Sequence, residues 1–231
     1  MYLLLDIGNT RAKAALVKQG KVSALPQLAP DNLAKLAIKA VYFASVASQE
    51  KVLSVRQSLA LDHLPWRQVH SEAQAFGLTN CYQQPQTLGV DRWLAMLGAQ
   101  LLQPKRNLLV VDAGTAVTID WLDVSGQHSG GWIVPGLKLQ QQAVVKNTAK
   151  VFNAETFHGR LEAGVDTVTG LQNGCLASVL GAIRLAWQSA ACDKLMLTGG
   201  DSKFLKPYLA DLPVIIEPLL VFHGLVRYID T

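Results

Sequence analysis

The stretch MYLLLDIGNTRAKAAL (residues 1–16) is echoed by NLLVVDAGTAVTIDWL (residues 107–122) past the middle of the chain. Each runs an apolar strand into an aspartate, continues with a glycine and a threonine, and then resumes an apolar pattern. An acid at the end of a buried strand is costly unless it has a partner. The repetition therefore predicts two similar units, each with a carboxylate that serves a chemical purpose.

Outward from these two stretches, strands alternate with helices in both halves. In the first half the pattern predicts strands over residues 2–5, 41–46 and 67–70, two strands joined at residues 19–21, and helices over 49–61 and 93–102. In the second half it predicts strands over 107–114, 194–201 and 213–217, a hairpin over 116–134 that turns near Ser125 and Gly126, and helices over 136–151, 167–190, 202–209 and 219–229. The chain is thus expected to be an α/β protein with two halves, residues 1–104 and 105–231.

Composition excludes several classes of protein. The 231 residues are half hydrophobic, and 21 Lys and Arg against 17 Asp and Glu give a net charge of +4 without a basic run, so we expect no nucleic-acid partner. The opening apolar run is short and lacks a basic leader, and the later run over residues 214–226 is interrupted by Glu217 and Pro218, so we expect no membrane segment. Three widely spaced cysteines favour a reducing cytoplasm.

The segment DIGNT and the lysine that follows it have the composition of a phosphate site. Asp6 can hold Mg²⁺ or its waters, and Gly8 permits a tight turn or a close backbone approach. Asn9, Thr10 and Lys13 supply donors and a positive charge for a transferring phosphoryl group. The alternative is an ordinary Asp-x-Gly hairpin turn with a surface lysine.

The second loop, DAGT, shifts the balance towards nucleotide binding. Asp112, Gly114 and Thr115 repeat the arrangement, and TGGD (residues 198–201) adds another strand that ends in a glycine turn. Two such loops, facing each other across a cleft between the halves, can grip a nucleoside triphosphate from both sides. The constellation resembles the acetate and sugar kinase, Hsp70 and actin superfamily, which implies a duplicated ribonuclease H-like (actin-like ATPase) fold with a mixed five-stranded sheet in each half.

A second acid stands at the start of the helix predicted around residues 93–102. Asp91 would be stabilised in its ionised form by the exposed N–H groups of the helix. It can then accept the proton of a substrate hydroxyl, while Arg92 binds an acidic group of the substrate or the phosphoryl charge. The alternative is a helix cap at Asp91 with Arg92 in a surface ion pair.

Taken together, these motifs resemble type III pantothenate kinases. The resemblance rests on DIGNT with Lys13, the pattern Tyr-x-x-Pro-x-x-Leu-Gly-x-Asp-Arg over residues 82–92, DAGTAVTID (residues 112–120), and GGWIVPGL (residues 130–137), in that order. It covers nearly the whole chain. It implies phosphorylation of pantothenate by ATP to 4'-phosphopantothenate, the first committed step towards coenzyme A, by a homodimer.

The resemblance also implies a role for each matching position. Asp91 would be the general base, Asp6 would help hold Mg²⁺, and Asp112 would help bind a monovalent cation, K⁺ or NH₄⁺. ATP would be bound by Asp6, Ile7, Gly8, Asn9, Thr10, Arg11, Ala12, Lys13 and Thr115. Pantothenate would be bound by Tyr82, Gly89, Val90, Asp91 and Arg92, with Thr167 completing the site across the dimer interface.

Several features stand outside this pattern. The family more often has Gly-x-Asn-Thr where this chain has Gly-Val-Asp-Thr (residues 164–167), which bears on the contact between subunits. The five histidines show no metal-ligand spacing and are interpreted as surface or hydrogen-bonded residues. Trp132 either lines the substrate site or packs in the core. Two other functions stay open: an accessory protein that keeps the fold without kinase activity, and a kinase or phosphohydrolase for another small molecule.

Overall fold

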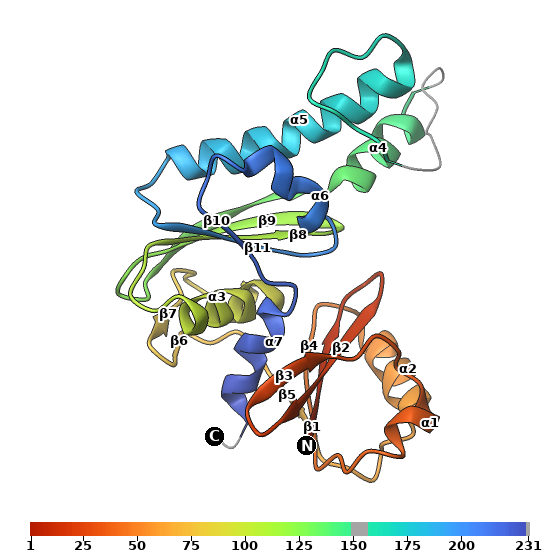
Figure 1. Cartoon of the computed structure of the whole chain (residues 1–231). Helices are drawn as coiled ribbons and strands as arrows, with labels where there is room; N and C mark the ends of the chain where they lie inside the picture. Colours follow the sequence, from red (N-terminus) through yellow and green to blue (C-terminus); the bar gives the residue numbers. More distant parts are fainter. Residues whose placement is uncertain (149–156, 230–231) are drawn as a thin grey trace. The chain divides into compact units, whose positions relative to one another are not determined.

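The computed structural model describes residues 1–148 and 157–229. It contains two five-stranded sheets, ordered β3-β2-β1-β4-β5 and β10-β9-β8-β11-β12, and a two-stranded sheet of β6 and β7 (Figure 1). The two large sheets have the same order of strands along the chain: the first strand is central, its hairpin partners lie on one side, and the later strands lie on the other. The predicted duplication of an α/β unit is confirmed.

The first sheet is built from the N-terminal meander and two further strands. Central β1 pairs antiparallel with β2 and parallel with β4. The elements of this part of the chain are β1 (Tyr2–Ile7), β2 (Ala12–Lys18), β3 (Lys21–Ala24), α1 (Pro30–Leu33), β4 (Val41–Ser45), α2 (Gln49–Leu59), β5 (Trp66–Gln68), β6 (Gln74–Ala75), β7 (Leu78–Thr79), the 3₁₀ helix η1 (Pro85–Thr87) and α3 (Val90–Leu102).

The second sheet repeats this arrangement, and its β11 is parallel to both β8 and β12. The elements are β8 (Leu108–Ala113), β9 (Ala116–Leu122), β10 (His128–Pro135), α4 (Leu137–Lys146), α5 (Thr167–Gln188), β11 (Lys194–Thr198), α6 (Ser202–Leu205), η2 (Lys206–Leu209), β12 (Val214–Ile216), α7 (Leu220–Leu225) and η3 (Val226–Tyr228).

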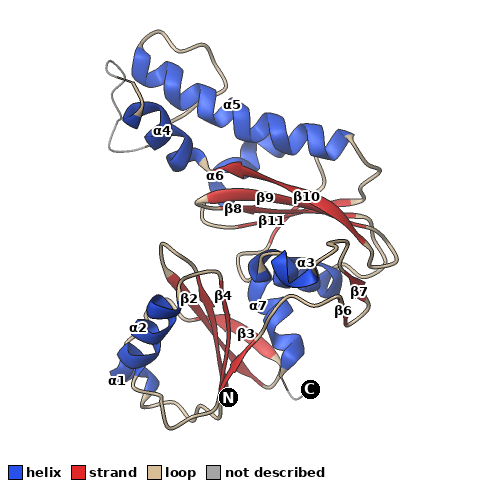
Figure 2. Cartoon of the chain, turned by 180° about the vertical axis from the view of Figure 1, so that it is seen from behind, coloured by secondary structure: helices blue, strands red, loops and turns tan. Residues whose placement is uncertain are grey.

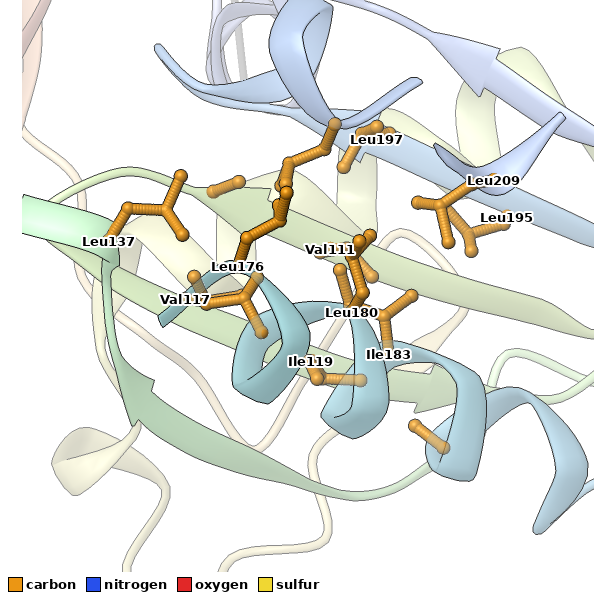
Figure 3. Close-up of a cluster of buried hydrophobic side chains, with 14 of the residues drawn as sticks. Val111, Val117, Ile119, Leu137, Leu176, Leu180, Ile183, Leu195, Leu197 and Leu209 are labelled. Atoms are coloured by element: carbon orange, nitrogen blue, oxygen red, sulfur yellow. The ribbon is translucent and has the colours of Figure 1, made fainter. Parts of the chain in front are cut away.

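Each sheet is covered by helices with a separate apolar core. In the first unit, alternate residues of β1 pack with Leu33 of α1 and Leu59 of α2. In the second unit, Leu176, Leu180 and Ile183 of α5 point at the side chains of β8, β9 and β11 (Figure 3). Burial of these side chains is the main favourable term for each unit, because apolar surface leaves water when the helix docks on the sheet.

The C-terminal helix α7 packs against α3 and crosses it (Figure 2). They approach so closely that a Cβ on Gly98 would lie 2.1 Å from the Leu220 carbonyl oxygen, and one on Gly224 would lie 2.0 Å from that of Leu94. Glycine at both positions is what lets the backbones meet. This contact joins the end of the chain to the unit that carries β1 and α3.

The sequence predicts two halves divided once, after residue 104, but each compact unit of the structure is built from more than one segment of the chain. One unit comprises residues 1–106, 122–130 and 219–231, and the other comprises residues 107–121 and 131–218. The tip of the β9–β10 hairpin and the C-terminal segment thus belong with the first unit. The boundary predicted between residues 104 and 105 divides the two repeats of the element order, and it stays a prediction.

Three predicted helices are shorter in the structure. The helix expected over 136–151 ends at Lys146, and the end of that prediction lies outside the described residues. The helix expected over 202–209 tightens into η2 from Lys206, where Pro207 lacks the N–H that would continue an α-helix. The last helix likewise ends as a 3₁₀ turn. Among the described residues, no helix has the length and apolarity needed to cross a membrane.

Candidate active site

The first aspartate loop joins β1 to β2. Asp6 and Lys13 are direct partners in the antiparallel ladder, and the Lys13 Nζ lies 3.9 Å from an Asp6 carboxylate oxygen. The Asp6 side chain is 14% exposed and that of Lys13 is 36% exposed. The turn closes through a hydrogen bond from the Gly8 N–H to the Arg11 carbonyl, at 3.1 Å. Asn9, Thr10 and Arg11 are exposed at its tip.

Glycine is favoured at position 8 by packing. A Cβ there would lie 3.3 Å from the Arg11 carbonyl oxygen, which is a tight contact. The loop therefore places one carboxylate and one ammonium group next to a turn of exposed backbone and hydroxyl groups. Such a set of groups can meet phosphate oxygens and the cation that accompanies them.

The second aspartate loop is enclosed by the turn that follows β11. Asp112 is the register partner of Thr198, and the next residue, Gly199, has a φ of +91°. A Cβ on Gly199 would lie 2.2 Å from the Ala113 carbonyl oxygen and 2.4 Å from an Asp112 carboxylate oxygen. The predicted glycine turn at residues 198–201 thus wraps the Asp112 carboxylate.

Thr115 follows on the same loop and is exposed. Its carbonyl oxygen accepts a hydrogen bond from the Gly136 N–H at 2.9 Å, which ties the loop to the start of α4. A Cβ on Gly136 would lie 2.1 Å from the Gly114 carbonyl oxygen, so only glycine permits this approach. The segment GGWIVPGL thereby fixes the backbone of the second loop.

The first turn of α3 carries the candidate base. Gly89 is the N-cap and Asp91 lies in the first turn, where one carboxylate oxygen accepts a hydrogen bond from the Arg92 N–H at 2.8 Å. A Cβ on Gly89 would lie 2.6 Å from that oxygen. The Asp91 carboxylate therefore folds back over Gly89, towards the positive end of the helix dipole.

Arg92 and Tyr82 form a direct contact. The Arg92 guanidinium donates to the Tyr82 hydroxyl at 2.9 Å, and its Cζ lies 5.8 Å from the centre of the Tyr82 ring. Arg92 is 4% exposed, so this cation is largely removed from water. The Tyr82 N–H in turn donates to Asn80 Oδ1 at 3.0 Å. The structure thus brings together Tyr82, Gly89, Asp91 and Arg92, which the sequence assigned to one site. Val90, assigned to the same site, is buried.

His128 belongs to this cluster, and its contact with Cys81 agrees with the hydrogen-bonded alternative of its interpretation. Its ring stacks on Tyr82 with the ring centres 6.0 Å apart and the planes at 19°, and its Nδ1 lies 3.5 Å from the Cys81 sulfur. The imidazole is completely buried. The signal in the sequence was weak: His128 follows the turn of the hairpin at Gly126, and only the fold brings that turn to the Thr79 N–H, which donates to the Gly126 carbonyl at 2.9 Å.

Thr167 begins α5 in the second unit and is exposed. The preceding Asp166 is the N-cap: its carboxylate accepts from the Thr169 N–H at 2.8 Å, and Thr169 returns the contact in a capping box. This hydrogen bond lowers the pKa of Asp166. Because Asn and Asp cap helices equally well, Asp166 in place of the family's more usual Asn preserves the start of the helix.

Trp132 is 37% exposed and packs edge-on against Trp121, so the core alternative is wrong for this side chain. Its neighbour Ile133 is also exposed. Within residues 1–148 and 157–229, no three His, Cys, Asp or Glu side chains gather into a metal cluster. A divalent cation at Asp6 would take phosphate oxygens and waters among its further ligands, a set that suits Mg²⁺.

The chain is similar in sequence and fold to known proteins. Residues 2–189 match the family described as type III pantothenate kinase. A type III pantothenate kinase of Colwellia psychrerythraea is 38% identical, and the alignment covers all of this chain and 96% of that protein. Among solved structures, one from Campylobacter jejuni, described as a conserved member of the Baf family of transcriptional activators, is 26% identical with a TM-score of 0.63 over 97% of this chain and 96% of its own.

A more distant structure supports the fold alone. MreB5 of Spiroplasma citri bound to ADP is 10% identical, with a TM-score of 0.52 over 99% of this chain and 95% of its own. The likeness extends over both five-stranded sheets and agrees with the expected actin-like architecture.

Proposed function

Since the chain belongs to the type III pantothenate kinase family, we propose that Asp91 is the general base of its reaction and that Tyr82 and Arg92 bind the acceptor. The chain is a pantothenate kinase: it transfers a phosphoryl group from ATP to pantothenate, the first step of coenzyme A biosynthesis. One observation carries the proposal. Asp91 and Arg92 are adjacent in the first turn of α3, and the Arg92 guanidinium donates a hydrogen bond to the Tyr82 hydroxyl at 2.9 Å.

The base role follows from the position of Asp91. Asp91 lies in the first turn of α3, where the helix dipole favours negative charge, and its carboxylate oxygens can accept a proton. As the acceptor hydroxyl of pantothenate attacks the γ-phosphorus of ATP, the proton passes from that oxygen to Asp91 and the bond to the leaving ADP oxygen breaks. Asp91 then releases the proton to solvent before the next turnover.

Recognition of the acceptor is assigned to the neighbouring groups. Pantothenate is an anion, and the buried guanidinium of Arg92 supplies the opposite charge in surroundings where water screens it little. Tyr82 fixes the guanidinium and offers its hydroxyl and ring to the substrate. Gly89 and Val90 contribute backbone groups at the helix start.

We assign ATP binding to the two aspartate loops. The residues involved are Asp6, Ile7, Gly8, Asn9, Thr10, Arg11, Ala12 and Lys13 of the first loop and Thr115 of the second. Lys13 neutralises charge on the transferring phosphoryl group, and exposed Asn9 and Thr10 donate to phosphate oxygens. Asp6 would hold Mg²⁺, whose charge neutralises the ATP phosphates when it is bound. Asp112, enclosed by the Gly199 turn, would hold the monovalent cation, K⁺ or NH₄⁺, which offsets negative charge beside the nucleotide.

The assembly is proposed to be a homodimer in which Thr167 reaches the acceptor of the partner subunit. Supporting this, the second unit exposes apolar side chains near α4 and α5, among them Ile133 (62% exposed), Val165 (95%) and Leu185 (56%). Cys81, Cys175 and Cys192 form no disulfide bond with one another, which suits the reducing cytoplasm proposed as the compartment.

The direct test is Asp91→Asn. We expect the variant to fold normally and to bind ATP, because the amide keeps the size of the carboxylate, while kcat falls by about 10²–10⁴-fold for loss of a general base. Steady-state kinetics and ATP titration measure the two effects separately. Near-normal turnover would remove Asp91 from the role of base.

Gly89→Ala provides a second test of the same geometry. The backbone of Gly89, with φ of −53°, accepts alanine, but the added Cβ collides with the Asp91 carboxylate. The collision meets a rotatable side chain, so we expect little loss of stability and a clear loss of kcat. Unchanged kcat would show that the position of this carboxylate does not matter.

Release of ADP by the purified protein with Mg²⁺ and ATP separates the remaining functions. Release that requires both pantothenate and K⁺ supports the acceptor and the cation site together. No release in either K⁺ or Na⁺ buffer favours the accessory-protein alternative. Release without pantothenate indicates a phosphohydrolase.

A further inference from the structure

A tyrosine near the C-terminus lies at the junction of two segments that lead to the acceptor site. The Tyr228 hydroxyl accepts a hydrogen bond from the Trp93 indole N–H at 2.9 Å and donates to a Glu72 carboxylate oxygen at 2.5 Å. Its ring packs edge-on against Phe76, with the ring centres 4.9 Å apart. The partners come from two separate parts of the chain, residues 72–76 and the start of α3, and both parts lie in the first compact unit.

One of these contacts reaches the acceptor site through α3. Trp93 is completely buried and follows Arg92 directly in the helix. A buried indole N–H is costly without an acceptor, and the Tyr228 oxygen provides one. The hydrogen bond therefore favours a single placement of the first turn of α3, which carries Asp91 and Arg92.

The other contact reaches the acceptor site through the segment that leads to Tyr82. The Glu72 carbonyl accepts from the Asn80 side-chain amide at 3.1 Å, and Asn80 Oδ1 accepts from the Tyr82 N–H at 3.0 Å. A second Asn80 contact, from the same amide to the Pro85 carbonyl at 3.2 Å, holds the far side of this loop. Glu72 is thus two hydrogen bonds away from Tyr82.

The neighbouring Arg227 strengthens the same attachment. Its guanidinium lies 4.8 Å from the centre of the Phe76 ring and donates to the Phe76 carbonyl at 3.0 Å and to Gln100 Oε1 at 2.9 Å. Burial lowers the pKa of the Arg227 guanidinium below its usual value. The end of the chain is therefore held to both the β6–β7 hairpin and α3.

From these contacts we propose that Tyr228 is a positioning residue for the acceptor site. Its single oxygen sets the spacing between the segment that carries Tyr82 and the helix that carries Arg92, and so maintains their mutual contact. The inference rests on the proposed role of Tyr82 and Arg92 in binding pantothenate. It assigns to the C-terminal segment, which lies beyond the residues matched to the family, a part in the specificity of the enzyme.

The test begins with Tyr228→Phe in the full-length protein. Phenylalanine keeps the ring contact with Phe76 but loses both hydrogen bonds, so the fold should persist while the acceptor site loosens. We expect the KM for pantothenate to rise about fivefold, as for the loss of one or two net hydrogen bonds, with the KM for ATP and kcat changed less than about twofold. Unchanged kinetics, or equal rises in the KM for both substrates, would overturn the proposal.

Two variants of Glu72, one that keeps the hydrogen bond from Tyr228 and one that removes it, test the same contact from the other side. The side chain is exposed, so its replacement does not disturb a core. Glu72→Gln retains an oxygen that accepts from Tyr228 and should stay near the wild-type KM, whereas Glu72→Leu should reproduce part of the Tyr228→Phe effect. The double variant Tyr228→Phe with Glu72→Leu should be no worse than Tyr228→Phe alone, because both changes remove the same contact. Fully additive increases in the KM for pantothenate would contradict the proposal that Tyr228 and Glu72 act through one contact.

Tyr208→Phe is the matched control. It removes a hydrogen bond from the Tyr208 hydroxyl to the Gly159 carbonyl, at 3.3 Å in the second unit, and should leave the KM for pantothenate unchanged. Arg92→Gln and Tyr82→Phe, measured in parallel, separate the two levels of the proposal. If neither raises the KM for pantothenate, the proposed acceptor site fails; if both raise it and Tyr228→Phe does not, only the inference about Tyr228 fails.

Discussion

The two aspartate loops share one backbone arrangement and differ in the side chains that surround the acid. In the first loop the Ile7 carbonyl accepts from the Val46 N–H at 3.2 Å, and in the second the Ala113 carbonyl accepts from the Asp201 N–H at 3.0 Å. Both carbonyls follow the aspartate by one residue, and both donors follow the parallel neighbour strand. The duplicated unit therefore places the two carboxylates at equivalent strand ends.

The surroundings of the two acids are not equivalent. Seven residues after Asp6 stands Lys13, its partner in the ladder, whereas seven residues after Asp112 stands Ile119, which is completely buried. Asp112 is instead approached by the backbone of Gly199. An acid beside a lysine suits a site that also receives phosphate, while an acid enclosed by backbone and lacking the lysine suits a bound cation. We therefore propose that the two loops, although they share one backbone arrangement, bind different charged groups.

The largest expected effect tests this division directly. Asp6→Asn should lower kcat/KM by about 10³-fold, equivalent to about 4 kcal/mol, because the carboxylate proposed for Mg²⁺ is lost. Asp112→Asn should mainly reduce the stimulation by K⁺ over Na⁺. Titration of both variants with Mg²⁺ and with K⁺ distinguishes the two acids: Asp6→Asn should respond to excess Mg²⁺, and Asp112→Asn should not.

The opposite pattern, or the same ion dependence in both variants, would contradict the assignment of different tasks to the two loops. Thermal unfolding of each variant without ligands serves as the control. Asparagine matches aspartate in size, so neither variant should lose its folded structure, and a kinetic effect without a change in Tm can be ascribed to the site.

A second prediction concerns the glycine that encloses Asp112. Gly199→Ala places a Cβ 2.2 Å from the Ala113 carbonyl oxygen at a φ of +91°, so strain and overlap should destabilise the second unit by about 3 kcal/mol. At Gly114 a Cβ would have its nearest contacts at 3.8 and 3.9 Å, so Gly114→Ala should cost less than about 1 kcal/mol. Urea unfolding of both variants measures the difference. Equal losses would show that the turn at Gly199 does not depend on close approach to Asp112.

Much of this comparison was accessible from the sequence. Apolar runs that end in Asp6 and Asp112 predicted the central strands and the strand-end acids, because residues in a buried strand must be apolar until the strand leaves the core. The first turn of α3 was also predicted to carry Asp91 and Arg92, since an acid suits a helix N-terminus. Local patterns therefore identified the elements of both units and the candidate base.

Other features depend on contacts that leave no local pattern. The strands β6 and β7 have two residues each, too few for a period to be recognised. The contact of His128 with Tyr82 joins residues far apart in the chain, and the crossing of α3 with α7 depends on Gly98 and Gly224, each an isolated glycine in an apolar run. Lys13 was predicted from the sequence to act at the site, but its contact with Asp6 was not. The pairing of β1 with β2 shows how the lysine is held beside that acid.

The smallest expected effect concerns that lysine. Lys13→Met makes the first loop resemble the second by replacing the cation with an apolar side chain. We expect kcat to fall about 30-fold, or about 2 kcal/mol, because charge on the transferring phosphoryl group is no longer neutralised. Stability should change little, since the Asp6 contact is long at 3.9 Å and the lysine is partly exposed. Lys18→Met, at the exposed end of the same strand, should leave kcat unchanged. An equal loss in both variants would mean that general positive charge, and not the pairing with Asp6, distinguishes the first loop from the second.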